Sequence, residues 1–305
     1  MKIIIVGKQK FSFSVLQKFN EETEHDVVAF LSDSSIADKI DDQIKSYSAN
    51  NKIPFFKNIN FNDEKLINKI KNMRPDICIL AYVNSFIPKL FRDIPVKGTI
   101  CYHPSLLPEH RGPSAINWPI IFGSKKTGLT IFYPNDQLDR GDIILQKKIS
   151  IKPNETLGDV YFSKLYPLGV EACVEAVDLI VSGNVKRITQ DESKASYETW
   201  CKKSNAKIYW ENSGQDIYNL IRGCNPHPGA WANLNSKEFF FYDTVYKINK
   251  LINNCPGQIL SIKKNEIIVA VKKGTLNISK IKSEQGKLFV KDMDTTIFKN
   301  GDIFS

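Results

Sequence analysis

The sequence lacks several patterns that would each assign it to a class of protein. Its 305 residues contain no uninterrupted apolar run near the ~18 residues of a membrane-spanning helix. No two of its six cysteines form a CxxC pair, and their spacing suits neither a zinc site nor a compact disulfide framework. The balance of 42% apolar and 25% charged residues excludes disordered, collagen-like and coiled-coil chains. The sequence predicts a globular protein of one large domain or two ordinary ones, with no membrane partner.

The first residues also lack the features of a targeting signal. The segment MKIIIVGKQK has only four successive apolar residues, too few for the core of a signal peptide, and predicts a first β-strand. Free cysteine behaves as a small hydrophobe, and most of the cysteines here stand next to apolar residues. We therefore expect buried free thiols in the reducing cytoplasm.

Positive charge is concentrated in the last third of the chain. The formal net charge is +9, and residues 201–305 hold 16 Lys and Arg against 9 Asp and Glu. Such a region can steer a polyanion. Lysines scattered along exposed strands are equally typical of solubility and edge protection. The sequence leaves both interpretations open.

Short apolar runs alternate with helical patterns in the first half of the chain. The runs lie at 2–6, 27–31, 53–56, 76–82 and 98–102. This alternation predicts an α/β fold with βαβ units and a mostly parallel, Rossmann-like sheet. The first turn, GKQKFS, has one glycine where the dinucleotide-binding fingerprint needs three, so we expect no nucleotide there.

The second half begins with a long helical pattern and ends in strands. The helix covers 156–182, and Pro167 predicts a break within it. Five short strand patterns follow, at 230–234, 238–242, 258–262, 266–271 and 275–281. They predict a small β-barrel of the oligonucleotide/oligosaccharide-binding type. We place the domain boundary near residue 200, which gives domains over 1–200 and 201–305.

The segment GTICYHPSLLPEHRGPSAINW, residues 98–118, brings a strand to its end at His103. Open α/β sheets place their ligands at the carboxyl ends of parallel strands. Pro104 and Pro108 stiffen the loop that follows. His103 is therefore a candidate catalytic residue, although a structural histidine is also compatible with this pattern.

Asp139, in QLDRGD, lies in a loop between two predicted strands. An acidic residue in such a loop is commonly a turn former. An Asp and a His on neighbouring sheet ends can also form a general acid/base pair, because the carboxylate orients the imidazole. Asp142, which begins the next strand, is the alternative carboxylate.

Two separated motifs, YHPSLLPEHRG and GLTIFYPNDQLDRGDIILQ, resemble the formyltransferases that use 10-formyltetrahydrofolate. The segments KIIIVG, NSFIP, IRGCNPHPGAW and PGQILSIKKNEIIVA extend the resemblance over the whole chain. Within that family, HRGPSAINW and ASYETW resemble the N-terminal hydrolase domain of 10-formyltetrahydrofolate dehydrogenase more than methionyl-tRNA formyltransferase. The acidic stretch after the second apolar run is a poor arm for RNA phosphates.

The resemblance implies a formyltransferase fold, a catalytic domain over 1–200, a barrel domain over 201–305, 10-formyltetrahydrofolate as formyl donor and no metal. It implies that His103 stabilises the oxyanion and transfers protons while Asp139 orients His103. The implied folate-binding residues are Ser85, Phe86, Ile87, Ser105, Leu106, Leu107, Pro108, Asp136 and Asp139. Arg111 either braces the loop or contacts an acidic acceptor.

Cys101 departs from the pattern of the family, whose usual triad has an asparagine two residues before the histidine. Alternate residues of a strand face the same side, so we expect Cys101 to point toward the site with His103. Three roles stay open for it. The thiol is a weak hydrogen-bond donor, a packed core residue, or a thiolate that takes the formyl group transiently.

Three functions follow from these observations. The first is an enzyme that moves the formyl group of 10-formyltetrahydrofolate to a small nucleophilic acceptor (an amine, a thiol or water) and releases tetrahydrofolate. The second is a methionyl-tRNA formyltransferase acting on initiator tRNA, for which the basic last third is the compositional support. The third is a non-catalytic folate-binding module, motivated by Cys101.

Overall fold

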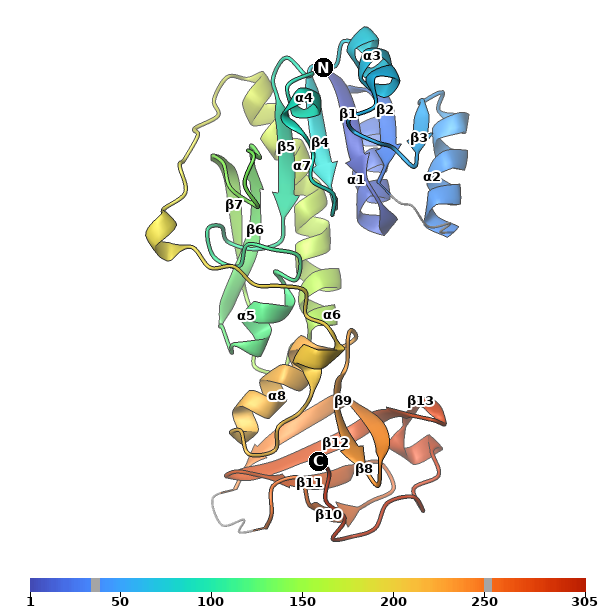
Figure 1. Ribbon diagram of the computed structural model, residues 1–305, viewed down its shortest axis with the longest axis vertical. Coiled ribbons are helices and arrows are strands. Elements are labelled where there is room, and N and C mark those ends of the chain that lie inside the picture. The colour runs from blue at the N-terminus through green and yellow to red at the C-terminus, as the bar shows by residue number, and fades with distance from the viewer. Residues whose placement is uncertain (34–38, 250–253) are drawn as a thin grey trace. The chain divides into compact units, whose positions relative to one another are not determined.

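The computed structural model describes residues 1–33, 39–249 and 254–305 (Figure 1). The chain forms two compact units, each assembled from three segments of sequence. The first unit contains Met1–Pro113, Gly128–Lys148 and Lys164–Tyr197. The second contains Ser114–Thr127, Ile149–Ser163 and Glu198–Ser305. The division of the sequence into domains over 1–200 and 201–305 stays a prediction.

The first unit is built on a seven-stranded sheet of order β3-β2-β1-β4-β5-β6-β7 (Figure 1). The strands are β1 (Lys2–Gly7), β2 (Asp26–Ser32), β3 (Phe55–Lys57), β4 (Ile77–Ala81), β5 (Thr99–His103), β6 (Lys126–Phe132) and β7 (Ile143–Ser150). β1 to β5 pair in parallel, and β6 runs antiparallel to β5. Successive side chains of the central strands β1 and β4 are buried, so both faces of the sheet are covered there, as parallel sheets require. The predicted Rossmann-like sheet is confirmed.

Helices connect these strands. They are α1 (Gln9–Glu22), α2 (Lys39–Asn50), α3 (Glu64–Met73), the short α4 (Lys89–Arg92) and α7 (Tyr166–Val181). In α3 the Asp63 side chain caps the Lys65 N–H, and apolar residues at helical spacing are buried. The sequence analysis missed α2, a mostly polar helix in which Ile44 is the buried apolar residue.

The predicted break at Pro167 is confirmed. Helix α6 (Leu157–Val160) passes into a π-helical turn (Tyr161–Leu165), and α7 begins at Tyr166. Pro167 stands in the first turn of α7, directly after the π-helical turn, and its lack of an N–H fits this local change in the hydrogen-bond pattern.

The second unit is built on an antiparallel sheet of order β10-β11-β12-β9-β8, with β13 beside β12 (Figure 1). The strands are β8 (Ala230–Leu234), β9 (Lys237–Ile248), β10 (Ile259–Ile262), β11 (Ile267–Val271), β12 (Gly274–Ser283) and β13 (Gly286–Phe289). One apolar core, which includes Trp210, Phe241 and Phe304, fills this unit. The predicted second β-domain is confirmed, and β13 is a strand that the sequence analysis missed.

Helix α8 (Gly214–Gly223) of this unit packs against α5 (Asn117–Ile121), which comes from the middle of the sequence. Asn117 Nδ2 donates a hydrogen bond to the Gly223 carbonyl oxygen at 3.0 Å. A Cβ at Gly223 would lie 2.6 Å from Ile121 Cγ1, so the close approach of the two helices requires glycine there. Across the described ranges, no helix is long and apolar enough to cross a membrane.

Candidate active site

His103 is the last residue of β5, where the sheet changes from parallel to antiparallel pairing. Its side chain is buried, and Nε2 lies 2.9 Å from the carbonyl oxygen of His110. A carbonyl oxygen can only accept, so this contact assigns a hydrogen to Nε2. Nδ1 is therefore the ring nitrogen that is free to gain and lose a proton.

Asp139 faces this nitrogen. Its Oδ1 is 3.7 Å from His103 Nδ1, a separation longer than a hydrogen bond but within the range of an ion pair with an imidazolium. Its Oδ2 accepts the Gly112 N–H at 2.7 Å, which fixes the carboxylate. The structure thus brings together the histidine and aspartate that the sequence indicated. Asp142, the residue directly before β7, instead accepts a hydrogen bond from the Thr189 hydroxyl.

A segment that follows α7, residues 189–197, joins the two loops of the site; we name it the strap. The side-chain amide of Gln190 donates to the carbonyl oxygens of Asp139, at 3.0 Å, and Gly141, at 2.9 Å. Ser196 accepts the His110 N–H with its hydroxyl oxygen at 2.8 Å. The strap therefore holds the turn that carries Asp139 as well as the loop that contacts His103.

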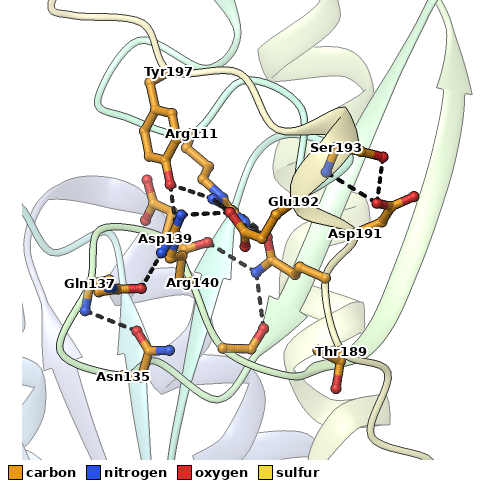
Figure 2. A network of polar contacts seen from close by, with 12 residues as sticks. Arg111, Asn135, Gln137, Asp139, Arg140, Thr189, Asp191, Glu192, Ser193 and Tyr197 are labelled. Carbon is orange, nitrogen blue, oxygen red and sulfur yellow. Dashed lines mark hydrogen bonds and ion pairs between the residues drawn. The ribbon is translucent and has the colours of Figure 1, made fainter.

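Arg111, Arg140, Glu192 and Tyr197 converge at the centre of this network (Figure 2). Arg111 is fully buried and donates to Glu192 Oε1 at 2.8 Å and to the Tyr197 hydroxyl. Arg140 donates to Glu192 Oε2 at 2.6 Å. The hydrogen bond from Arg111 lowers the pKa of the Glu192 carboxyl. These contacts favour the interpretation of Arg111 as a brace of the loop over that of an acceptor-binding residue.

Cys101 lies two residues before His103 on β5 and is half-buried. Its side chain packs against the apolar cluster of Leu107, Phe132 and Ile143. Burial, with a smaller contribution from the Asp139 charge, raises the pKa of the thiol well above its ordinary value. The thiol is protonated at neutral pH, which favours a packed or weakly donating role over a thiolate nucleophile.

The predicted folate-binding residues at 85–87 follow β4. Ser85 donates to Asp33 Oδ1 at 2.6 Å, and the Asn84 N–H also approaches this carboxylate, at 3.3 Å. Phe86 is 64% exposed, whereas Ile87 is buried in the core beneath it. The segment is thus anchored by Asp33 and Ile87, and it presents the Phe86 ring to solvent.

The predicted residues at 105–108 form a loop whose polar groups are bound within the protein. Ser105 donates to the Glu109 carbonyl oxygen at 2.6 Å, and the Leu107 N–H donates to Thr130 Oγ1 at 3.1 Å. Leu106 is half-buried, and its side chain lies close to the Gly128 backbone. The Pro108 carbonyl oxygen accepts from the Ser196 N–H of the strap at 3.2 Å. These bonds fix the shape of the loop beside His103.

Asp136, the remaining predicted folate contact, is exposed and pairs with Arg92. Sequence reasoning did not select several residues that structure this region: Asp33, Arg92, Gln190, Glu192 and Tyr197. None of them stands in the two motifs, and of the five only Tyr197 lies in a segment, ASYETW, that carried the family resemblance. Over the described parts of the chain, no group of three or more His, Cys, Asp or Glu side chains is placed to hold a metal ion.

Comparison with known proteins assigns the chain to a family. Residues 1–177 match the formyl transferase family, and residues 201–296 match the formyl transferase C-terminal domain. The chain belongs to the formyl transferase family. The family that the two sequence motifs indicated is thus confirmed, and its members are enzymes.

Two relatives with different architectures match this formyl transferase chain. The cytosolic 10-formyltetrahydrofolate dehydrogenase of Xenopus laevis is 37% identical over 82% of the chain, which spans only 28% of the dehydrogenase. The methionyl-tRNA formyltransferase of Fusobacterium nucleatum is 34% identical over 94% of both proteins. Among solved structures, HypX from Aquifex aeolicus in complex with tetrahydrofolic acid covers 100% of the chain and 50% of HypX, with a TM-score of 0.68 and 16% identity. At this identity the structural likeness shows the fold alone.

Proposed function

We propose that this formyl transferase moves the formyl group of 10-formyltetrahydrofolate to a small nucleophilic acceptor (an amine, a thiol or water) and releases tetrahydrofolate. The observation that supports it is the imidazole of His103, at the end of β5, with Nδ1 3.7 Å from the Asp139 carboxylate. The dehydrogenase relatives are named for the same folate. We propose Ser85, Phe86, Ile87, residues 105–108, Asp136 and Asp139 as the folate-binding residues.

The chemistry requires two proton movements. The nucleophile adds to the formyl carbon and gives a tetrahedral oxyanion. The bond from this carbon to the folate nitrogen then breaks, and the nitrogen takes a proton. His103 Nδ1 accepts the proton from the nucleophile and later delivers it to the leaving nitrogen, while Asp139 stabilises the imidazolium in between. Cys101 stays protonated beside the pair.

Turnover of 10-formyltetrahydrofolate by the full chain tests this proposal. Release of tetrahydrofolate is measured with water alone and then with thiols, amino sugars, amino acids and charged tRNA as acceptors. We expect turnover with at least one acceptor and its loss in His103→Ala. Folate binding without turnover against any acceptor would instead identify a non-catalytic folate-binding module, and absence of both would remove folate chemistry altogether.

A second candidate is a methionyl-tRNA formyltransferase, and two observations favour it. The relative with this activity matches over 94% of both chains. On neighbouring strands, lysine ammonium groups lie over aromatic rings: Lys280 over Phe289, Lys282 over Phe240 and Lys287 over Tyr242. Lysines bind phosphates, and an exposed ring such as Phe289 can stack on a base, so a polynucleotide fits this face.

Binding of initiator tRNA at increasing salt tests the second candidate. Phosphate contacts give a steep fall of affinity with salt, and Lys280→Gln together with Lys282→Gln should reduce that slope by about two. The matched control is Lys237→Gln, since Lys237 pairs with Glu284 and has no ring beneath it among the described contacts. Absence of tRNA binding at low salt would eliminate this candidate.

A further inference from the structure

Arg92, the last residue of α4, is a charged side chain that is only 7% exposed. Its Nη1 donates to the carbonyl oxygen of Pro134 at 2.7 Å, and its Nη2 pairs with the Asp136 carboxylate. Its guanidinium carbon lies 5.9 Å from the centroid of the Phe86 ring, within the range of a cation–π contact. One side chain thus contacts both of the segments, 85–87 and 134–136, that we propose to bind the folate.

The backbone of Arg92 is tied to the strand of the proposed catalytic histidine. Thr99, at the start of β5, donates its hydroxyl hydrogen to the Arg92 carbonyl oxygen at 2.8 Å. Thr99 is itself buried, and β5 ends at His103. The backbone from which the guanidinium extends is therefore fixed relative to β5, the strand that carries the proposed catalytic histidine.

Both terminal nitrogens of the guanidinium bind the same loop. Nη1 donates to the Pro134 carbonyl oxygen and Nη2 to the Asp136 carboxylate. Because the group is planar and rigid, the two bonds fix the 134–136 loop in one orientation relative to α4. Arg92 therefore sets the position of this loop as well as contacting the Phe86 ring.

We infer that Arg92 is a positioning residue for the formyl donor. It holds Phe86 and the 134–136 loop as the two walls between which the folate is proposed to bind. This inference rests on the proposed function, because it takes the folate as the molecule between the two walls. It adds a residue that lies outside both sequence motifs.

The test compares Arg92→Lys with a matched control on the same helix, in the full-length chain. Lys keeps the charge near Asp136 but cannot supply the planar fork. The control, Lys89→Met, removes an exposed cation that pairs with Asp93. For Arg92→Lys we expect the Kd for tetrahydrofolate and the KM for the donor to rise about tenfold, because lysine loses one of the two hydrogen bonds that hold the 134–136 loop. We expect kcat and the KM for the acceptor to change little, and Lys89→Met to match wild type.

Several outcomes decide the inference. A folded Arg92→Lys protein with unchanged Kd overturns it, and so does a fall in kcat at unchanged donor affinity, which would make Arg92 a support of His103 only. If Arg92→Lys does not fold, Thr99→Val replaces it, because the Thr99 hydroxyl holds the Arg92 backbone and Thr99 is not among the proposed folate contacts. Weaker tetrahydrofolate binding by that variant supports the inference, and unchanged binding overturns it.

The same measurements separate this inference from the proposed function. If wild type turns the donor over while the variants keep its affinity, only the role of Arg92 fails. If wild type binds tetrahydrofolate without turnover and Arg92→Lys weakens that binding, the role of Arg92 stands and formyl transfer fails. If wild type does not bind tetrahydrofolate, both fail.

Discussion

The side-chain amide of Gln190 donates a hydrogen bond at 3.0 Å to the carbonyl oxygen of Asp139, a residue 51 positions earlier in the chain. The backbone of Asp139 has a φ of +48°, a left-handed conformation that is strained for a residue with a side chain. Gln190 is buried and also binds the Gly141 carbonyl oxygen. The strap thus holds in place the turn that aims the carboxylate at His103.

Replacement of Gln190 should impair catalysis and stability together. Gln190→Leu leaves the Asp139 and Gly141 carbonyl oxygens without this partner and should lower the free energy of unfolding by ~1–3 kcal/mol. The turn is then free to move, and the Asp139 carboxylate is less well oriented toward His103. We expect kcat to fall about tenfold, which corresponds to the free energy of about one hydrogen bond. The measurements are urea unfolding and donor turnover.

The control for Gln190 is Asp191→Asn, on the neighbouring residue of the strap. Asp191 accepts from Ser193 and pairs with Lys194, and neither partner belongs to the site. Its turnover should equal that of wild type. Equal losses in the two variants would show that the strap acts by general stability and has no specific effect on Asp139.

His103→Ala should leave the fold intact and abolish formyl transfer. An acid/base residue contributes ~10²–10⁴ to the rate, so the variant should retain well below a tenth of wild-type kcat. Donor turnover checks the loss, and tetrahydrofolate binding checks that the donor site persists. A variant that retains more than about a tenth of the rate contradicts the assignment of His103.

Asp139→Asn should be nearly as damaging as His103→Ala, and the double variant should be little worse than either. Residues that act as one device are non-additive, because loss of one partner already removes the function of the other. The values of kcat/KM for wild type, the two single variants and the double variant form a double-mutant cycle. Losses that multiply would show that the imidazole and the carboxylate, 3.7 Å apart, work independently.

A functional residue can be predicted from the sequence when the residues next to it in the chain form a recognisable pattern. His103 and Asp139 were predicted because each stands in a short motif at a strand end. Gln190 and Arg92 were not, because they lie in a polar loop and a four-residue helix that carry no periodic pattern. The charge of Arg92 indicates an exposed residue, and only the fold buries it against Pro134 and Asp136.

The missed elements have the same cause. Helix α2 buries few apolar residues, so its sequence lacks the amphipathic period that marked α3. Strand β13 is short and has two exposed residues at its start, so only its pairing with β12 defines it. Apolar runs, in contrast, predicted the first five strands of the sheet. The signal is clearest for β1 and β4, because burial on both faces leaves an uninterrupted apolar segment.

Cys101 should behave as a packed thiol. Cys101→Ala should keep most of the activity, because burial raises the pKa of the thiol and no thiolate is available for reaction. Cys101→Asn inserts an amide beside Leu107, Phe132 and Ile143 and should lower the free energy of unfolding by ~1–3 kcal/mol. Turnover and urea unfolding are measured on both variants. A rise in turnover of the asparagine variant at unchanged stability would identify Cys101 as a weak oxyanion donor instead.

The strap should weaken in acid. The Arg111 hydrogen bond lowers the pKa of Glu192 from its ordinary value of 4.5. A carboxyl whose pKa is lower in the folded state stabilises the fold fully above its unfolded pKa, and that contribution is lost as the pH falls through the lowered value. Wild type should therefore lose stability more steeply than Glu192→Gln below pH 4.5.

Urea midpoints measured from neutral pH down to about pH 3 check this difference. The control is Glu284→Gln, since Glu284 is an exposed partner of Lys237 in the second unit. Its curve should be parallel to that of wild type. Parallel curves for Glu192→Gln and wild type would show that the bonds from Arg111 and Arg140 do not couple Glu192 to folding.

The three-segment origin of the second unit restricts how this protein can recombine with its relatives. Helix α5 lies within the part that matches the formyl transferase family, whereas α8, against which it packs, lies within the part that matches the C-terminal domain. Asn117 and Ile121 of α5 fit closely against Gly223 of α8. A hybrid gene joined near residue 200 would pair an α5 from one parent with an α8 from the other. Viable exchanges between family members must therefore carry residues 117–121 along with the C-terminal domain.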